Sequence, residues 1–219
     1  MTTIMRDAVS PDLRTTLRAL KLGQMLETLP DRLTLARQQK MTHADFLELV
    51  LADEVTRREA KSASLRARAA GLDPGMRLDT WDESAAVRYD HQLWNELTSL
   101  RFLDGPHGAL VLGPVGVGKT HLACALGHIA IRRRRTVHMA SAAKLFKRLK
   151  AARLDNTLDY EMRRLATVEL LILDDFALQP LGPAETADFY ELCVERHQKA
   201  ATVMGPGCFH EEGTTVGHE

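Results

Sequence analysis

The chain is poor in cysteine and in aromatic residues, and it contains no long apolar run. Its 219 residues include three cysteines, and Phe, Trp and Tyr together make up 5%. So few thiols exclude the disulfide framework of small secreted domains and are typical of a reducing compartment. No stretch approaches the ~20 apolar residues that a membrane-spanning helix requires, and the first residues lack the apolar segment of a secretory signal. We therefore expect a cytoplasmic protein that is not bound to a membrane.

The sequence also lacks a net charge, because 29 basic residues balance 29 acidic ones. A hydrophobic content of 45% and a charged content of 26% are ordinary for a globular chain. The length suits one large domain or two small ones. The zero net charge conceals a local asymmetry, because basic residues gather before residue 70.

The most specific chemical signal is a glycine-rich segment at residues 108–120. A short apolar run leads into the pattern G-x-x-x-x-G-K-T, and an Ala- and Leu-rich helix is predicted at 121–131. The glycines let the backbone turn tightly and aim its N–H groups at a triphosphate at the start of that helix. We expect Lys119 to reach the β- and γ-phosphates and Thr120 to place its hydroxyl on Mg²⁺. The expected nucleotide-binding residues are Gly113, Pro114, Val115, Gly116, Val117, Gly118, Lys119, Thr120 and His121.

Two short apolar runs predict buried strands of a parallel sheet. One is 110–112, directly before the glycine-rich loop, and the other is 170–173. Two carboxylates, Asp174 and Asp175, follow the second run, and ligands of an open α/β sheet bind at that end of the strands. We expect Asp174 to hold Mg²⁺ and Asp175 to orient or deprotonate the attacking water. A turn or helix-capping role is the alternative for Asp175, because an aspartate reaches less far than the commoner glutamate.

The first seventy residues carry a helical pattern with a basic end. Leucines recur at helical spacing from residue 13 to 29, a break or a new helix falls at Pro30, and a capping box is predicted at Thr42–Asp45. The cations beyond Val55 favour either contact with DNA phosphates or a solvated helix end that suits the helix dipole. These cations are Arg57, Arg58, Lys61, Arg66 and Arg68.

A linker and an aromatic segment separate these helices from the glycine-rich loop. Gly71 and Gly75 enclose Pro74 and mark a break. Five large apolar residues follow, and they either pack on the sheet edge or wall an adenine; packing is favoured, because buried aromatics are more often core than ligand contacts. They are Trp81, Trp94, Leu97, Leu100 and Phe102. Strands at 136–140 and 201–204, with helices after Ser141 and at 183–199, complete an α/β pattern.

Three segments resemble the IstB-like transposition helper ATPases, AAA+ proteins related to the DnaC-type helicase loaders. They are residues 17–25, Gly-Lys-Thr-His-Leu-Ala at 118–123 and Leu-Asp-Asp-Phe at 173–176. The resemblance implies an α/β fold in which a P-loop AAA+ parallel sheet with flanking helices follows a small all-α domain. It also implies ATP and Mg²⁺ as cofactors, self-association on double-stranded DNA and regulation of a partner transposase. By motif, it assigns catalysis to Lys119 and Asp175, and the metal to Thr120 and Asp174.

The expected organisation has four parts. A helical domain for DNA binding and oligomerisation covers 1–75, a linker and edge segment 76–107, the ATPase core 108–204 and an irregular tail 205–219. The tail departs from the family pattern, because Gly205-Pro-Gly-Cys-Phe-His210 stands where relatives carry a Thr-Ser-Asn sensor. The last strand and the helical lid are then expected to be missing through truncation or a frame shift, with ATP turnover impaired. The alternative function is a catalytically defective remnant that acts at most as a nucleotide- or DNA-binding module.

Overall fold

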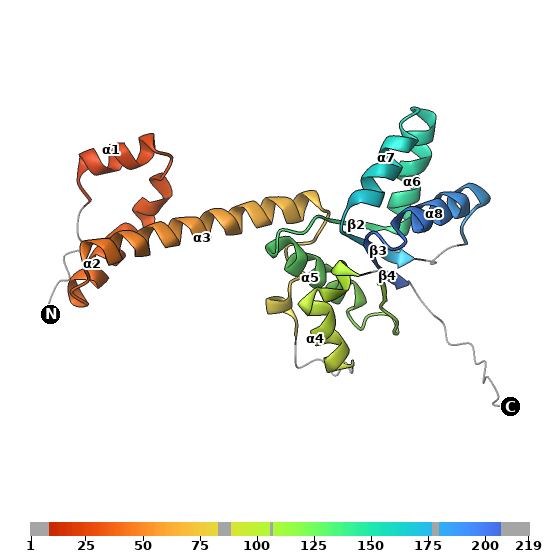
Figure 1. Cartoon of the computed structure of the whole chain (residues 1–219), viewed down its shortest axis with the longest axis horizontal. Helices are drawn as coiled ribbons and strands as arrows, with labels where there is room; N and C mark the ends of the chain where they lie inside the picture. Colours follow the sequence, from red (N-terminus) through yellow and green to blue (C-terminus); the bar gives the residue numbers. More distant parts are fainter. Residues whose placement is uncertain (1–8, 83–88, 106, 177–179, 207–219) are drawn as a thin grey trace. The chain divides into compact units, whose positions relative to one another are not determined.

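The protein consists of two compact units that divide between Ser62 and Ala63. The computed structural model describes residues 9–82, 89–105, 107–176 and 180–206 (Figure 1). The division falls inside helix α3 (His43–Ala69), whereas the sequence pattern predicts a domain end at 75. Residues 63–72 belong with the second unit because Ala67, Ala70 and Leu72 lie in its core. Among the described residues, no helix is both long enough and apolar enough to cross a membrane.

The first unit is helical, as expected. It contains α1 (Pro11–Ala19), the 3₁₀ turn η1 (Gly23–Glu27), α2 (Leu29–Gln38) and the first part of α3. Pro30 stands in the first turn of α2, where its fixed φ suits a helix start, so a helix begins there. The capping box before α3 is confirmed, since the Asp45 N–H donates to Thr42 Oγ1 at 3.2 Å. The buried apolar side chains that form the hydrophobic core of this unit are Val9, Leu17, Met25, Leu29 and Val50.

The second unit is an α/β structure around a four-stranded parallel sheet. The strands are β1 (Ala109–Leu110), β2 (Val137–Ser141), β3 (Leu170–Phe176) and β4 (Ala201–Pro206), in the order β1-β4-β3-β2. All three neighbouring pairs are parallel, with Leu110 opposite Met204 and Ile172 opposite Val203. The helices are α4 (His91–Ser99), α5 (Lys119–Arg132), α6 (Ala142–Leu154), α7 (Leu158–Thr167) and α8 (Pro183–Arg196), with 3₁₀ turns η2 (Leu78–Thr80) and η3 (Arg101–Asp104). The predicted α/β class is confirmed.

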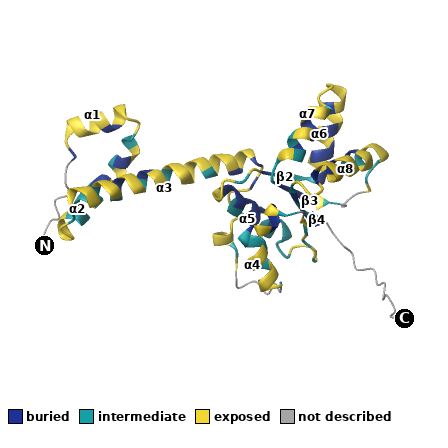
Figure 2. Cartoon of the chain, viewed as in Figure 1, coloured by how far each residue is buried: buried dark blue, intermediate teal, exposed yellow. Residues whose placement is uncertain are grey.

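Strand β3 forms the centre of two hydrophobic layers, one on each face of the sheet. Leu170 and Ile172 pack with α5 and the end of α3 on one face. Leu171 and Leu173 pack with α6, α7 and α8 on the other. Strands β3 and β4 are accordingly buried over most of their length (Figure 2). Because successive strand side chains point to opposite faces, one apolar run fills both layers.

The strand predicted before the glycine-rich loop is confirmed as a parallel strand over Ala109–Leu110, but the predicted burial of residues 110–112 is wrong. Leu110 and Leu112 are 57% and 60% exposed, and the strand is limited to two residues, although the Val111 N–H still donates to Met204 O at 2.9 Å. The cause is strand order, because β1 lies at the edge of the described sheet with β4 on one side. Two further boundaries differ: α8 ends at Arg196, and β4 continues to Pro206.

Candidate nucleotide site

The glycine-rich loop joins β1 to α5 at the carboxyl end of the sheet. Gly116 and Gly118 have φ values of +83° and +90°, a region that residues with a Cβ rarely adopt. Gly118 is the N-cap of α5, so the free N–H groups of the first helical turn face the loop. The positive end of the helix dipole and these donors together form an anion-binding geometry.

Lys119 and Thr120 occupy the first turn of α5. The Lys119 ammonium donates to the carbonyls of Gly113 at 2.8 Å and Pro114 at 2.7 Å, so the side chain folds back over the loop. A lysine in this place can exchange those carbonyls for phosphate oxygens, because both are hydrogen-bond acceptors. Pro114, Val115 and Gly116 are exposed, whereas Val117 to His121 are half-buried.

The two predicted carboxylates lie at the end of β3, across β4 from the loop. Asp174 is half-buried and stands against Gly205, where a Cβ would approach Asp174 Oδ1 to 3.1 Å. Asp175 is exposed and has a φ of +51°, which is uncommon for a residue other than glycine. Such backbone conformations cluster at functional sites.

The donor set suits Mg²⁺ better than a softer metal. The Thr120 hydroxyl and the Asp174 carboxylate are hard oxygen donors, and Mg²⁺ takes one or two protein ligands beside phosphates and water. Within the described residues, no group of three or more His, Cys, Asp or Glu side chains gathers in the manner of an all-protein metal cage.

A cavity of about 430 Å³ adjoins Asp175, between β3 and the helices α6 and α8. Its wall combines Asp175 with Ser141 at the end of β2, with α6 and with the start of α8. Lys147, Lys150 and Glu185 contribute charged groups to it. Asp175 therefore borders an open space beside β3 that is large enough to hold water.

One aromatic residue lies directly on the loop. The indole of Trp81 contacts Gly118, since a Cβ there would lie 2.6 Å from its ring, and it meets the His121 ring edge-on at 5.2 Å. Trp94 contacts Tyr89 instead. The preference for core packing is confirmed for Leu100 and Phe102, which are buried. For Trp81 the sequence analysis offered packing on the sheet edge or contact with an adenine. It did not predict contact with the glycine-rich loop, because that contact depends on how the chain after Gly71 is folded.

Most of the predicted DNA-binding cations have partners within the protein. Arg57 and Arg58 both bind Glu54, a side chain 5% exposed, at 2.8 and 2.7 Å. The hydrogen bond from Arg57, opposed by burial, lowers the pKa of Glu54 to about 2. Arg66 donates to Ile131 O at the end of α5. Lys61 and Arg68 are exposed.

Comparison with known proteins gives a consistent family. The profile of IstB-like ATP binding proteins matches residues 15–215. An insertion-sequence protein of Mycobacterium tuberculosis described as ATP-binding is 35% identical over 186 residues, covering 85% of this chain and 74% of that protein. A similarly described protein of Sinorhizobium fredii is 31% identical over 188 residues, covering 86% and 77%.

Two solved structures share the fold. AMPPCP-bound DnaA from Aquifex aeolicus has a TM-score of 0.54 at 21% identity, over 65% of this chain and 49% of that chain. The DnaC helicase loader has a TM-score of 0.53 at 18% identity, over 64% and 81%. These likenesses confirm the predicted α/β fold. With the profile covering the loop, both carboxylates and most of the helical unit, the chain belongs to the family of IstB-like ATP binding proteins.

Proposed function

We propose that this protein is an ATP-hydrolysing helper of insertion-sequence transposition. One observation carries the proposal. A glycine-rich loop at the start of α5 and two carboxylates at the end of β3 both lie at the carboxyl ends of the strands of one sheet. This arrangement is the one that phosphoryl transfer requires, because the reaction depends on positioning and charge neutralisation. Action on DNA also fits the expected cytoplasmic location.

Each residue of the site has a distinct task in this mechanism. The backbone N–H groups from Val115 to Thr120 hold the triphosphate, and Lys119 neutralises the β- and γ-phosphates. Thr120 and Asp174 hold Mg²⁺, which when bound supplies charge for the transferring phosphoryl group. Asp175 orients the attacking water, which enters from the adjoining cavity.

Asp175→Asn is the variant that tests hydrolysis. Asn adopts a positive φ as readily as Asp, so the backbone is kept and only the charge is lost. We expect ATP affinity within about twofold of wild type and turnover lowered by about 10²-fold or more, the range of general-base catalysis. Steady-state phosphate release measures turnover, and calorimetry measures affinity. Unchanged turnover would remove Asp175 from the mechanism, and binding without turnover in the wild type would leave a nucleotide-binding module.

We further propose that the basic part of α3 binds duplex DNA through its exposed cations. Lys61 and Arg68 carry this role better than Arg57 and Arg58, whose charges are compensated by Glu54. Arg66 is engaged at the end of α5. Each phosphate contact contributes a slope of about −0.9 to the dependence of log affinity on log salt.

The DNA proposal is tested on the full chain with two double variants. Lys61→Gln with Arg68→Gln should weaken binding to every sequence and flatten the salt slope by up to about 2. Arg57→Gln with Arg58→Gln should instead lower the melting temperature, because Glu54 stays buried without a partner. Salt-insensitive binding, or no effect of the Lys61 and Arg68 changes, would contradict the proposal.

The partners are part of the same proposal, which the insertion-sequence context of the relatives supports. A partner transposase and self-association on double-stranded DNA are the expected interactions of an insertion-sequence helper. Sedimentation of the protein with and without duplex DNA, in the presence of ATP and Mg²⁺, tests the self-association. A protein that stays monomeric under both conditions would contradict it.

A further inference from the structure

The segment between α3 and Trp81 forms a strap, residues 71–81, that is fixed at its start to the sheet. The Met139 N–H of β2 donates to Ala70 O at 2.7 Å. Gly71 follows with a φ of +84°, and a Cβ there would lie 2.5 Å from Met139 O. The backbone can therefore pass β2 this closely only with glycine at the position.

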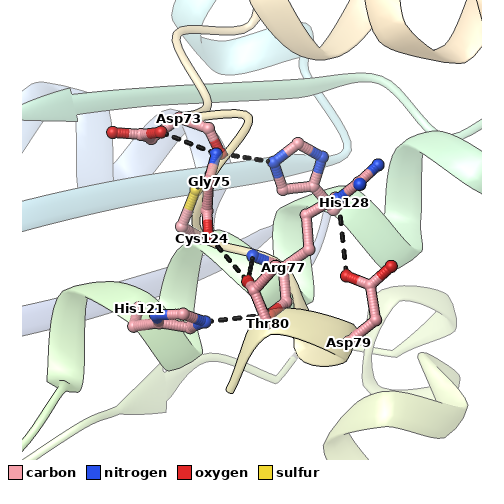
Figure 3. Close-up of polar contacts among 8 residues, drawn as sticks. All are labelled: Asp73, Gly75, Arg77, Asp79, Thr80, His121, Cys124 and His128. Atoms are coloured by element: carbon pink, nitrogen blue, oxygen red, sulfur yellow. Dashed lines mark hydrogen bonds and ion pairs between the residues drawn. The ribbon is translucent and has the colours of Figure 1, made fainter. Parts of the chain in front are cut away.

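The middle of the strap is held by one face of α5 (Figure 3). His128 Nε2 lies 2.8 Å from Asp73 O, and the Cys124 thiol donates to the same carbonyl at 3.7 Å. One to two turns nearer the loop, His121 Nε2 lies 2.8 Å from Arg77 O. A carbonyl accepts hydrogen bonds and cannot donate them, so both imidazoles carry their proton on Nε2. Residues at positions i, i+3 and i+7 share a helix face, which explains the common target.

Internal hydrogen bonds give the strap a defined shape. The Gly75 N–H donates to Asp73 Oδ1 at 2.8 Å. The Thr80 hydroxyl donates to Gly75 O at 2.7 Å and accepts from the Arg77 N–H at 3.0 Å. Figure 3 shows these contacts within the strap, beside the residues of α5. Arg77 therefore cannot leave His121 without shifting the residues that lead to Trp81.

The end of the strap reaches the glycine-rich loop. Trp81 Cη2 and Cζ3 would each lie 2.6 Å from a Cβ on Gly118, and the Trp81 and His121 rings meet at an angle of 74°. Gly118 is the point where the loop becomes α5. The position of the indole and the conformation of the loop at Gly118 are thus sterically linked.

We propose that His121 is a positioning residue for nucleotide binding, which acts by holding the strap so that Trp81 stays on the loop. The proposal rests on ATP binding at this loop. A docked strap preorganises the loop around Gly118, and a nucleotide on the loop stabilises the docked strap. The two effects are equal by thermodynamic linkage. Loss of the contact lowers the fraction of binding-competent loop and weakens apparent affinity by that fraction.

If His121 had a merely structural role, its removal would lower the stability of the whole unit. The core of the unit is anchored elsewhere, since Leu72 at the start of the strap is 4% exposed and packs near Gly127 and Ile172 of the hydrophobic layer. His121 is half-buried. We therefore expect removal of its hydrogen bond to act on Trp81 and on the loop, with little effect on global unfolding.

The test uses Trp81 as its own reporter. The sequence contains two tryptophans, so a Trp94→Phe background leaves Trp81 as the sole indole. In this background we expect ATP with Mg²⁺ to change the emission of Trp81. His121→Ala should shift the emission of the free protein and weaken ATP affinity by about 3- to 10-fold, the equivalent of one net hydrogen bond. His121→Gln keeps a donor near the Nε2 position and should restore most of both signals.

Controls separate this proposal from the nucleotide site itself. Arg132→Ala, an exposed change at the far end of α5, should leave affinity and emission unchanged. Trp81→Leu should weaken affinity as much as His121→Ala and keeps the test usable should His121→Ala fail to fold. If Lys119→Ala binds ATP as the wild type does, the nucleotide site is wrong. If Lys119→Ala loses binding while His121→Ala and Trp81→Leu retain full affinity, the positioning role alone is overturned.

Discussion

Arg196 shows how this fold uses a buried charge for structure. Its side chain is 3% exposed, and burial lowers its pKa to about 10. The guanidinium donates to Leu165 O at 2.6 Å and Val168 O at 2.8 Å, both at the end of α7, and to Ala201 O and Thr202 Oγ1 of β4. Helix ends leave carbonyls without partners, and one arginine here satisfies several of them. Arg196 thus ties α7, α8 and β4 together.

Arg196→Met should lower the free energy of unfolding by about 3 kcal/mol or more, since several buried carbonyls lose their donor at about 1–3 kcal/mol each. Urea denaturation measures the change. Lys199→Met is the matched control, because this exposed cation, 66% accessible, bonds Glu195 at 3.4 Å. We expect the control to stay within about 0.5 kcal/mol of wild type. Equal effects of the two variants would contradict the structural role of Arg196.

At the scale of elements, the apolar runs predicted where strands lie but not which strands pair with one another. The run at 170–173 is buried because β3 has a strand on each side. The run at 110–112 has a similar composition, yet Leu110 and Leu112 are exposed because β1 is an edge of the described sheet. Strand order depends on the whole topology, and hydrophobic periodicity does not predict it.

The candidate site also combines features that the sequence predicts with features that it does not. The loop and the carboxylates after β3 follow from local patterns, since the chemistry requires glycines, a lysine and acidic groups at fixed spacing. The strap contacts could not be predicted, because His121 and His128 bind backbone carbonyls that any residue type would offer. The ion pairs of Arg57 and Arg58 with Glu54 were also not predicted, although Glu54 lies one turn away on the same helix.

At the scale of the whole molecule, two groups in different units link stability to pH. His138 in the second unit has its pKa lowered to about 4, chiefly by burial and then by Arg164 and Arg148, with Glu161 acting in the opposite direction. The unfolded chain binds this proton near pH 6.5 and the folded chain only near pH 4. Stability should therefore fall as the pH drops through that window. The low pKa of Glu54 stabilises the first unit above pH 4.5, and this contribution is lost as the pH falls towards 2.

His138→Asn tests the first of these windows. The variant cannot take up the proton, so its melting temperature should change less than that of the wild type between pH 6.5 and 4. The comparison of slopes cancels any constant cost of the substitution. Parallel slopes for the two proteins would show that His138 does not control stability in this range.

ATP binding on the loop from Gly113 to Thr120 underlies every function proposed for this protein. Calorimetric titration of ATP with Mg²⁺ into the wild type and Lys119→Ala tests it most directly. We predict one site per chain in the wild type and an affinity about 100-fold lower in Lys119→Ala, because charge-assisted hydrogen bonds to phosphate are lost. Arg132→Ala should bind as the wild type does. Equal affinity in the wild type and Lys119→Ala would contradict the account.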